Sequence, residues 1–227
     1  MDKTILNLFI CVPSRAEVHM QFALSLQTLV GALRQQPVQG YDGASVSILN
    51  EINSCIAKSR YQLARKALEN GATHLLWVDT DQTFPPQLVH ALARHKKPIV
   101  GCNIAIKTLP SAPTARAKSE DWFGGHKVYS KGKKGLERVW RIGFGVVLIE
   151  AEVFKKIPEP WFNIRWDLAK REFVGEDWFF CEQAEAAGIP IFVDHDASLR
   201  VGHIGNFEFT HNHIIPESES PKLEVVA

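Results

Sequence analysis

Several features are missing from this sequence, and each absence excludes a class of protein. Its 227 residues include only four cysteines, with no CxxC pair, which argues against a disulfide framework and predicts reduced, mostly buried thiols. No apolar run approaches the ~20 residues that cross a bilayer. Residues 5–12 run into Pro13 without the small-residue cleavage site of a signal peptide. The net charge of +1 gives no overall attraction to nucleic acid or membrane.

What is present is the composition and element order of an α/β protein. Hydrophobic residues make up 45% of the chain and charged residues 22%, which is ordinary for a globular protein. β-rich runs alternate with helical apolar spacing, which implies a mostly parallel central sheet flanked by helices. Asn53 and Ser54 are expected to cap the second helix. We expect strands at 5–12, 44–52, 75–78, 98–104, 143–149 and 189–193, and helices at 18–33, 56–68, 85–92, 151–157 and 175–187.

The stretch from Thr73 to Pro86 carries the first chemical signal. An apolar run ends abruptly at Asp79, and Asp81 follows two residues later. Such a run is typical of a buried strand, and in open α/β sheets ligands bind at the carboxyl ends of the strands. Two neighbouring carboxylates oppose each other's ionisation unless a cation lies between them. The stretch therefore predicts a divalent-metal site for a phosphate-bearing substrate.

Two further features follow downstream: the pair Glu176–Asp177, and His203 in the sequence VGHIG. In this order on a βαβ framework, they and the aspartate pair resemble a GT-A fold glycosyltransferase, family-2-like, of the compact type found in bacteria and bacteriophages. The resemblance covers residues 5–205. It implies a single GT-A (Rossmann-like) domain at 1–205, with a nucleotide-binding half at 1–106 and an acceptor and catalytic half at 107–205. A polar C-terminal tail would occupy 206–227.

The resemblance also implies which residues meet the nucleotide-sugar. The loop residues Pro13, Ser14 and Arg15 follow the first strand and would hold the nucleotide. Arg60, on the second helix, would approach the same nucleotide. Gly145, in a glycine-started strand, would line the sugar and acceptor cleft.

The same resemblance implies a metal site and a catalytic base. Asp79, Asp81 and His203 would hold Mn²⁺ or Mg²⁺ on the donor diphosphate, with Asp81 as the direct ligand and Asp79 acting through water or a ribose contact. Oxygen ligands with one imidazole suit Mn²⁺, and the ion neutralises charge on the leaving diphosphate. Asp177 would be the base of an inverting displacement. Glu176 would support it or contact the acceptor.

The partners implied are a nucleotide-sugar donor, with a UDP-sugar favoured, and an acceptor hydroxyl. The acceptor could be a saccharide, a protein side chain or a modified DNA base. The basic stretch 107–141 is expected to be a solvated loop or hairpin outside the core, and its charge is the argument for a polyanionic acceptor. We expect a cytoplasmic protein with no membrane span, in the host cytoplasm if the chain comes from a phage.

Several aromatic and histidine side chains have a plain packing explanation beside a functional one. Trp161, Trp166 and Trp178 flank the acidic pair and could stack on a sugar or base, although large aromatics usually pack. Trp77 is expected in the core. His211 is expected on the surface without a function.

Three alternatives fit parts of the same pattern. In a haloacid-dehalogenase-type phosphatase Asp79 would be a nucleophile beside Asp81, but that motif ends the first strand, whereas here two strand–helix units precede it. A nucleotidyltransferase needs a glycine-rich loop after its first strand, and residues 11–15 contain no glycine. A non-catalytic nucleotide- or carbohydrate-binding module is the third alternative, and the joint presence of the aspartate pair, Asp177 and His203 argues against it.

Overall fold

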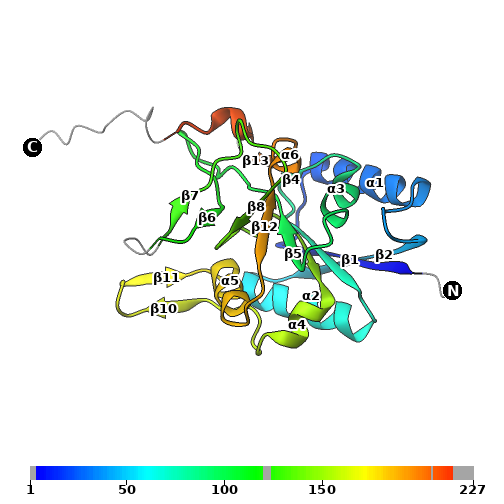
Figure 1. Ribbon diagram of the computed structural model, residues 1–227, viewed down its shortest axis with the longest axis horizontal. Coiled ribbons are helices and arrows are strands. Elements are labelled where there is room, and N and C mark those ends of the chain that lie inside the picture. The colour runs from blue at the N-terminus through cyan, green and yellow to red at the C-terminus, as the bar shows by residue number, and fades with distance from the viewer. Residues whose placement is uncertain (1–3, 120–123, 206, 217–227) are drawn as a thin grey trace, which may run out of the picture.

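A computed structural model describes residues 4–119, 124–205 and 207–216 of the chain (Figure 1). Its centre is a seven-stranded sheet. Five strands run in one direction, while the eighth and ninth strands of the chain run against them, so the predicted mostly parallel sheet is confirmed. In order across the sheet the strands are β2 (Gly43–Ile52), β1 (Ile5–Ser14), β3 (His74–Val78), β9 (Val146–Glu150), β5 (Ile99–Gly101), β12 (Ile191–Asp194) and β8 (Leu136–Val139).

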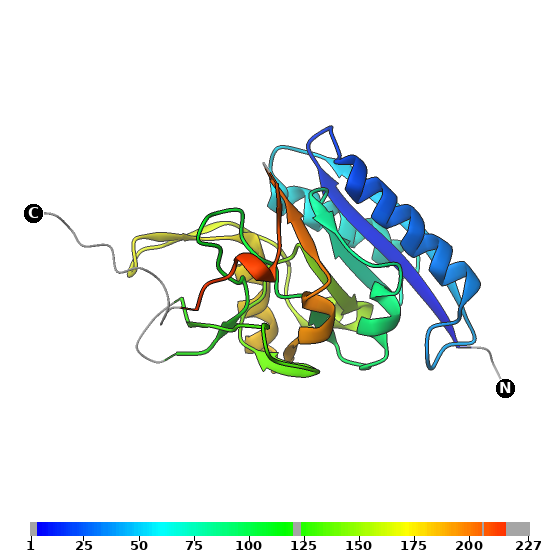
Figure 2. The same cartoon turned by 90° about the horizontal axis from the view of Figure 1, so that it is seen from above.

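Helices cover both faces of this sheet (Figure 2). Leu75 and Trp77 of β3 join one core cluster, whereas Leu76 and Val78 join the other, because successive strand side chains point to opposite faces. A strand buried on both faces needs a continuous apolar run, which is why β3 is easy to recognise in the sequence. The first face carries α2 (Ile56–Glu69), α4 (Ala151–Lys156) and α5 (Glu176–Ala186), and the second carries α1 (Met20–Gln35), α3 (Leu88–Ala93) and α6 (His195–Ser198).

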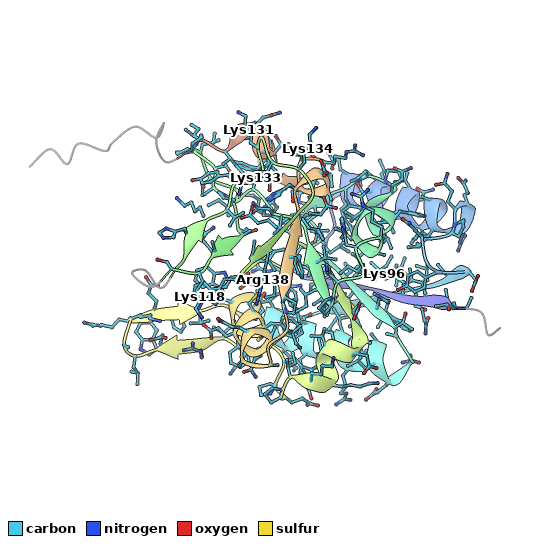
Figure 3. All side chains as sticks on the ribbon, viewed as in Figure 1. Lys96, Lys118, Lys131, Lys133, Lys134 and Arg138 are labelled. Carbon is cyan, nitrogen blue, oxygen red and sulfur yellow. The ribbon has the colours of Figure 1, made fainter. Side chains whose placement is uncertain are left out.

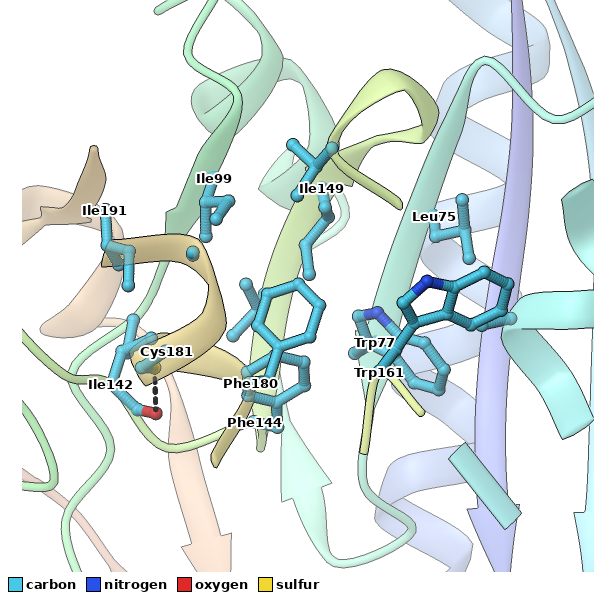
Figure 4. Close-up of a cluster of buried hydrophobic side chains, with 14 of the residues drawn as sticks. Leu75, Trp77, Ile99, Ile142, Phe144, Ile149, Trp161, Phe180, Cys181 and Ile191 are labelled. Carbon is cyan, nitrogen blue, oxygen red and sulfur yellow. Dashed lines mark hydrogen bonds between the residues drawn. The ribbon is translucent and has the colours of Figure 1, made fainter. Parts of the chain in front are cut away.

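Aromatic rings fill the first core cluster (Figure 4). Trp77, as predicted, is fully buried, and the rings of Phe144 and Phe180 pack with their centroids 5.1 Å apart. Trp161 is also buried here. The buried Cys181 thiol donates to the carbonyl oxygen of Ile142 at 3.7 Å. Of the four free cysteines only Cys55 is exposed, as the prediction of mostly buried thiols requires.

The order of the central strands differs from a simple parallel succession. β9 comes from the second half of the chain, yet it lies between β3 and β5 and runs antiparallel to both. Its residues 146–149 are buried, so a central position is the one that covers both of their faces. Strands from residues 1–106 and 107–205 therefore share a single sheet.

The basic stretch 107–141 is more structured than expected. Its end, β8, pairs with β12 at the edge of the central sheet, and a small ribbon of β6 (Arg116–Ala117) and β7 (His126–Lys127) precedes it. Val128, Ser130 and Arg141 are buried. The prediction that this stretch lies outside the core is therefore wrong, because its apolar and small residues alternate with the cations. Lys118, Lys131, Lys133, Lys134 and Arg138 are exposed (Figure 3).

A second sheet extends the fold past residue 205. It consists of β14 (Glu208–Phe209), β13 (Gly202–Ile204) and β4 (Gln82–Thr83), and a 3₁₀ turn, η1 (His211–His213), follows it. Phe209 and Ile214 are buried against Ala105. Of the expected tail at 206–227, residues 207–214 are thus folded, and residues 206 and 217–227 lie outside the described part. His211 is buried rather than exposed, with Nε2 2.7 Å from the Asn103 carbonyl oxygen.

The described part of the chain contains no helix that is long and apolar enough to cross a membrane.

Candidate active site

A cleft of about 840 Å³ opens where β1, β2 and β3 end. This is the edge of an open α/β sheet at which ligands bind. The chain segments 13–19, 53–56 and 79–81 form most of its wall. Of the predicted site residues, Pro13, Ser14, Arg15, Arg60, Asp79, Asp81, Glu176 and His203 line it, whereas Gly145 and Asp177 do not.

The loop after β1 is held in place by its neighbours on β2. Asn50 donates from Nδ2 to the Ser14 hydroxyl oxygen at 2.8 Å, and the Asn53 backbone N–H donates to the Ser14 carbonyl at 3.1 Å. Arg15 is exposed and has no ion-pair or hydrogen-bond partner within the described ranges. Gly145 lies behind the cleft, where its carbonyl accepts from the Asp79 backbone N–H at 3.1 Å. Gly145 thus supports the backbone of Asp79, and its place in a sugar and acceptor cleft stays a prediction.

Arg60, Asp79 and Glu176 form what we call the inner cluster. Arg60 donates from Nη2 to Asp79 at 2.9 Å and from Nε to Glu176 at 3.1 Å, although only 3% of its side chain is exposed. Its guanidinium lies 5.6 Å from the Trp77 ring centroid and 5.3 Å from that of Phe144, within the range of cation–π attraction. Burial alone would lower the pKa of Arg60, but Asp79 and Glu176 raise it overall. Arg60 therefore stays charged and pairs with both carboxylates.

One hydrogen-bond donor of the inner cluster has no acceptor among the described residues. Arg60 Nη1 is buried at the cleft and has no hydrogen-bond partner among the described residues. A buried polar group without a partner costs free energy, so a ligand group that reached the enclosed Nη1 would recover that cost. The predicted approach of Arg60 to a nucleotide is compatible with this geometry.

Asp81, Lys107 and His203 form the outer cluster. Lys107 Nζ lies 2.5 Å and His203 Nε2 3.3 Å from the same carboxylate oxygen of Asp81, Oδ2. Pairing of β13 with β4 sets His203 opposite Gln82, and the Ile204 N–H donates to the Asp81 carbonyl at 2.7 Å. Burial would raise the pKa of the Asp81 carboxyl, but the hydrogen bonds from His203 and Lys107 hold it well below its usual value.

The outer cluster has the donor set of a metal site that a substrate completes. His203 Nδ1 lies 2.8 Å from the Ala105 carbonyl oxygen. This contact orients the ring so that Nε2 points to Asp81 Oδ2, as contacts at the second ring nitrogen orient histidines that ligate metals. No group of three or more His, Cys, Asp or Glu side chains in the described part of the chain could hold an ion by itself. Mg²⁺ and Mn²⁺ sites commonly use one or two protein ligands plus phosphate and water, which these residues fit.

Asp177 lies at the start of α5, next to Glu176 but outside the cleft lining. Its Oδ1 accepts from the Trp178 backbone N–H at 2.7 Å. Burial, and then the like charge of Glu176, raise the pKa of Asp177 to about 6. A carboxyl with this pKa gains and loses a proton near neutrality, as a general base must.

Several lining residues were not predicted. Lys107 was counted as part of a basic stretch, although it is the one member of that stretch, within the described residues, that lines the cleft. Asn53 and Ser54 line the cleft as well. They do not cap α2 as predicted: the cap residue is Cys55, whose N–H donates to Asn53 Oδ1 at 2.9 Å. A polar pair that follows a strand looks the same in the sequence whether it caps the next helix or lines a cleft.

None of the flanking tryptophans lines the cleft. Trp161 is in the core, and Trp178 has the Arg141 guanidinium 4.3 Å from its ring centroid. Trp166 is 45% exposed on a hairpin formed by β10 (Arg165–Asp167) and β11 (Glu172–Val174), opposite Phe173. Packing therefore accounts for Trp161 and Trp178.

No protein-family model matches the sequence, and no curated protein matches it. Solved structures do match the fold. A197 from STIV superposes with a TM-score of 0.58 at 19% identity over 91% of both chains. GalNAc-T7, solved with UDP, GalNAc and Mn²⁺, has a TM-score of 0.56 at 14% identity over 90% of this chain and 45% of its own. The chain therefore spans less than half of that protein's length.

A catalytic domain of Drosophila β1,4-galactosyltransferase 7, in complex with xylobiose, matches 88% of this chain and 71% of its own at 14% identity, with a TM-score of 0.46. The predicted architecture is confirmed by the sheet, its helical layers and the two closer superpositions. The chain has the GT-A fold of glycosyltransferases.

Proposed function

We propose that this chain is a metal-dependent glycosyltransferase that transfers a sugar from a nucleotide-diphosphate donor to an acceptor hydroxyl. The observation that carries the proposal is the meeting of Asp79, Asp81 and His203 with the loop at Arg15 in one cleft of a GT-A fold. GalNAc-T7, which shares this fold, was solved with UDP, GalNAc and Mn²⁺. A UDP-sugar is accordingly the favoured donor.

The cleft suits a donor of this kind in size and charge. Its volume of about 840 Å³ lies within the range of small-molecule sites. Pro13, Ser14 and Arg15 would bind the nucleotide, and Arg60 would donate its spare N–H to it. Asp79, held by Arg60, would orient the ribose or a water.

Asp81 and His203 would hold Mn²⁺ or Mg²⁺ on the donor diphosphate. The bound ion supplies a Lewis acid for the charge that develops on the leaving diphosphate. The pairing of β13 with β4 keeps the two ligands together, and the contact of Nδ1 with the Ala105 carbonyl orients the His203 ring so that Nε2 points toward Asp81.

Asp177 would be the base that takes the acceptor proton in an inverting displacement. Its pKa of about 6 suits proton uptake near neutral pH. Glu176 is tied to Arg60, so it would position the arginine and contact the acceptor rather than accept the proton.

The acceptor is proposed to carry a free hydroxyl on a saccharide, a protein side chain or a modified DNA base. The exposed basic residues of stretch 107–141, apart from Lys107, do not line the cleft. They therefore add no support for the DNA option. Binding to duplex DNA that weakens steeply with salt would restore it.

The proposal is tested first by ligand binding. UDP with Mn²⁺ should raise the melting temperature of the wild-type protein, because a ligand that binds only the folded state stabilises it. Each component alone should raise it less. No stabilisation by any nucleotide sugar, with or without Mn²⁺, would contradict the proposal.

Turnover is tested next. Asp177→Asn should keep UDP binding and lower transfer by about 10²–10⁴-fold, the usual worth of a general base. Near-normal transfer by this variant would refute the base assignment. Wild-type protein that binds UDP but neither transfers nor hydrolyses a donor would indicate the binding module instead. Phosphatase chemistry through Asp79 is disfavoured, because Arg60 already occupies that carboxylate.

A further inference from the structure

Lys107 is the residue of the cleft whose contacts the proposed roles leave unexplained. It follows β5, and its ammonium lies 2.5 Å from Asp81 Oδ2. The same oxygen lies 3.3 Å from Nε2 of His203. The lysine charge therefore stands at the oxygen that a divalent cation would bind.

The path of the lysine side chain is built into the fold. A Cβ on Gly205 would lie 3.2 Å from Lys107 Cδ, so the missing side chain at this position leaves room for the stem. Gly205 directly follows β13, the strand that carries His203. One short segment thus places both His203 and the space through which Lys107 reaches Asp81.

Lys107 is also exposed enough to separate from Asp81. Its side chain is 38% exposed and that of Asp81 is 23% exposed, whereas Arg60 is 3% exposed and bound to two carboxylates. Three lysine or arginine side chains of the described residues line the cleft. Arg60 is already paired with two carboxylates, so Arg15 and Lys107 are the two that could bind an anion. A diphosphate carries more negative charge than a single exposed arginine neutralises.

We propose that Lys107 is an exchangeable counter-ion: it neutralises Asp81 in the free protein, gives up that oxygen when a divalent cation binds, and then binds the diphosphate of the donor. The proposal rests on the proposed function for its diphosphate half. It means that Lys107 opposes metal binding and favours nucleotide binding. Metal and nucleotide would consequently strengthen each other's binding through this side chain, since such coupling is reciprocal.

The test measures Mn²⁺ and UDP affinities of the full chain by titration calorimetry, with free Mn²⁺ also followed by electron paramagnetic resonance. Lys107→Met removes the charge and keeps most of the stem. Without nucleotide it should bind Mn²⁺ about fivefold more tightly than wild type, the equivalent of one half-exposed ion pair. With saturating Mn²⁺ it should bind UDP about tenfold more weakly, because a charged hydrogen bond is lost.

The control is Lys118→Met. Lys118 forms an ion pair of the same length with Glu185, outside the cleft (Figure 3), and its removal should change neither affinity. A structural defect would weaken both ligands, so opposite changes are the signature of exchange. Unchanged affinities, or weakening of both, in Lys107→Met would overturn the proposal.

Failure of the proposed function gives a different result. If wild-type protein binds Mn²⁺ but no UDP, the proposed function and the diphosphate half are refuted together. Tighter Mn²⁺ binding by Lys107→Met in that case still supports the counter-ion half, and equal binding refutes it.

Discussion

The inner and outer clusters contain Asp79 and Asp81, which are separated in the sequence by Thr80 alone. The two carboxylates nevertheless have different cationic partners and different exposure. In the inner cluster a buried arginine pairs with two carboxylates and packs on aromatic rings. In the outer cluster a half-exposed lysine and a histidine share one carboxylate oxygen. The first is a permanent part of the fold, whereas the second is open to exchange with solvent and ligands.

The difference follows from burial. A buried charge without its partner is costly, so the inner cluster survives only as a complete unit. Partly exposed charges regain solvation when they separate, so an exposed pair is worth little and can be replaced. The two aspartates therefore differ in how they are held: Asp79 pairs with a buried arginine, and Asp81 pairs with a partly exposed lysine and a histidine.

The largest effect is expected from breaking the inner cluster. Arg60→Met leaves Asp79 and Glu176 without their counter-ion and should lower the free energy of unfolding by about 3–5 kcal/mol, measured by urea denaturation. The matched control is Arg65→Met on the same helix, which removes an exposed i,i+4 pair with Glu69 and should cost less than about 1 kcal/mol. Equal losses of unfolding free energy in the two variants would show that the inner cluster stabilises the fold no more than an exposed ion pair does.

The next effect concerns ligand affinity rather than stability. Asp81→Asn should weaken Mn²⁺-dependent UDP binding by about 10–100-fold, the range seen when groups of a metal site are lost, and change the melting temperature little. Glu185→Gln, which alters the exposed pair with Lys118, serves as the control. Calorimetry that finds undiminished Mn²⁺-dependent binding in Asp81→Asn would remove the outer cluster from the metal site.

A smaller effect links the inner cluster to pH. Because the folded pKa of Asp177 is raised to about 6, the folded state binds more protons than the unfolded state between about pH 4 and 6. This contribution to stability is present below pH 4 and is lost as pH rises to 6. Asp177→Asn should therefore be more stable than wild type at pH 7, by about 2 kcal/mol, and not at pH 4. Denaturation at both pH values checks this, and a pH-independent difference would contradict it.

The smallest effect is the acid response of the outer cluster. The pKa of Asp81 is lowered in the folded state, so its contribution to stability is present above about pH 4 and is lost as pH falls below that value. Since Asp81 is partly exposed, the contribution should stay below about 1 kcal/mol. Wild type and Asp81→Asn should differ at pH 6 and converge toward pH 2 in urea titrations; divergence at low pH would argue against it.

Local sequence patterns determined most of the central layer. The run Leu75–Val78 announces a strand buried on both faces, and Gly71, at φ +76°, ends the preceding helix as its sequence predicts. The carboxyl end of that strand is where the cleft forms, because parallel strands end at a common edge. The same local logic predicted a strand at 143–149 but not the position of β9 between β3 and β5, since a strand's neighbours depend on contacts far along the chain.

The sequence by itself determined that Asp79 and Asp81 stand at the end of β3, at the edge of the sheet where the cleft forms. Only the tertiary structure decided which cations they meet, because these come from distant segments: Arg60 from α2, Lys107 from the loop after β5, and His203 from β13. Burial and strand register determine these partners, and the spacing of charged residues in the sequence predicts neither. The DxD stretch is thus one motif in sequence and two separate charge sites in space.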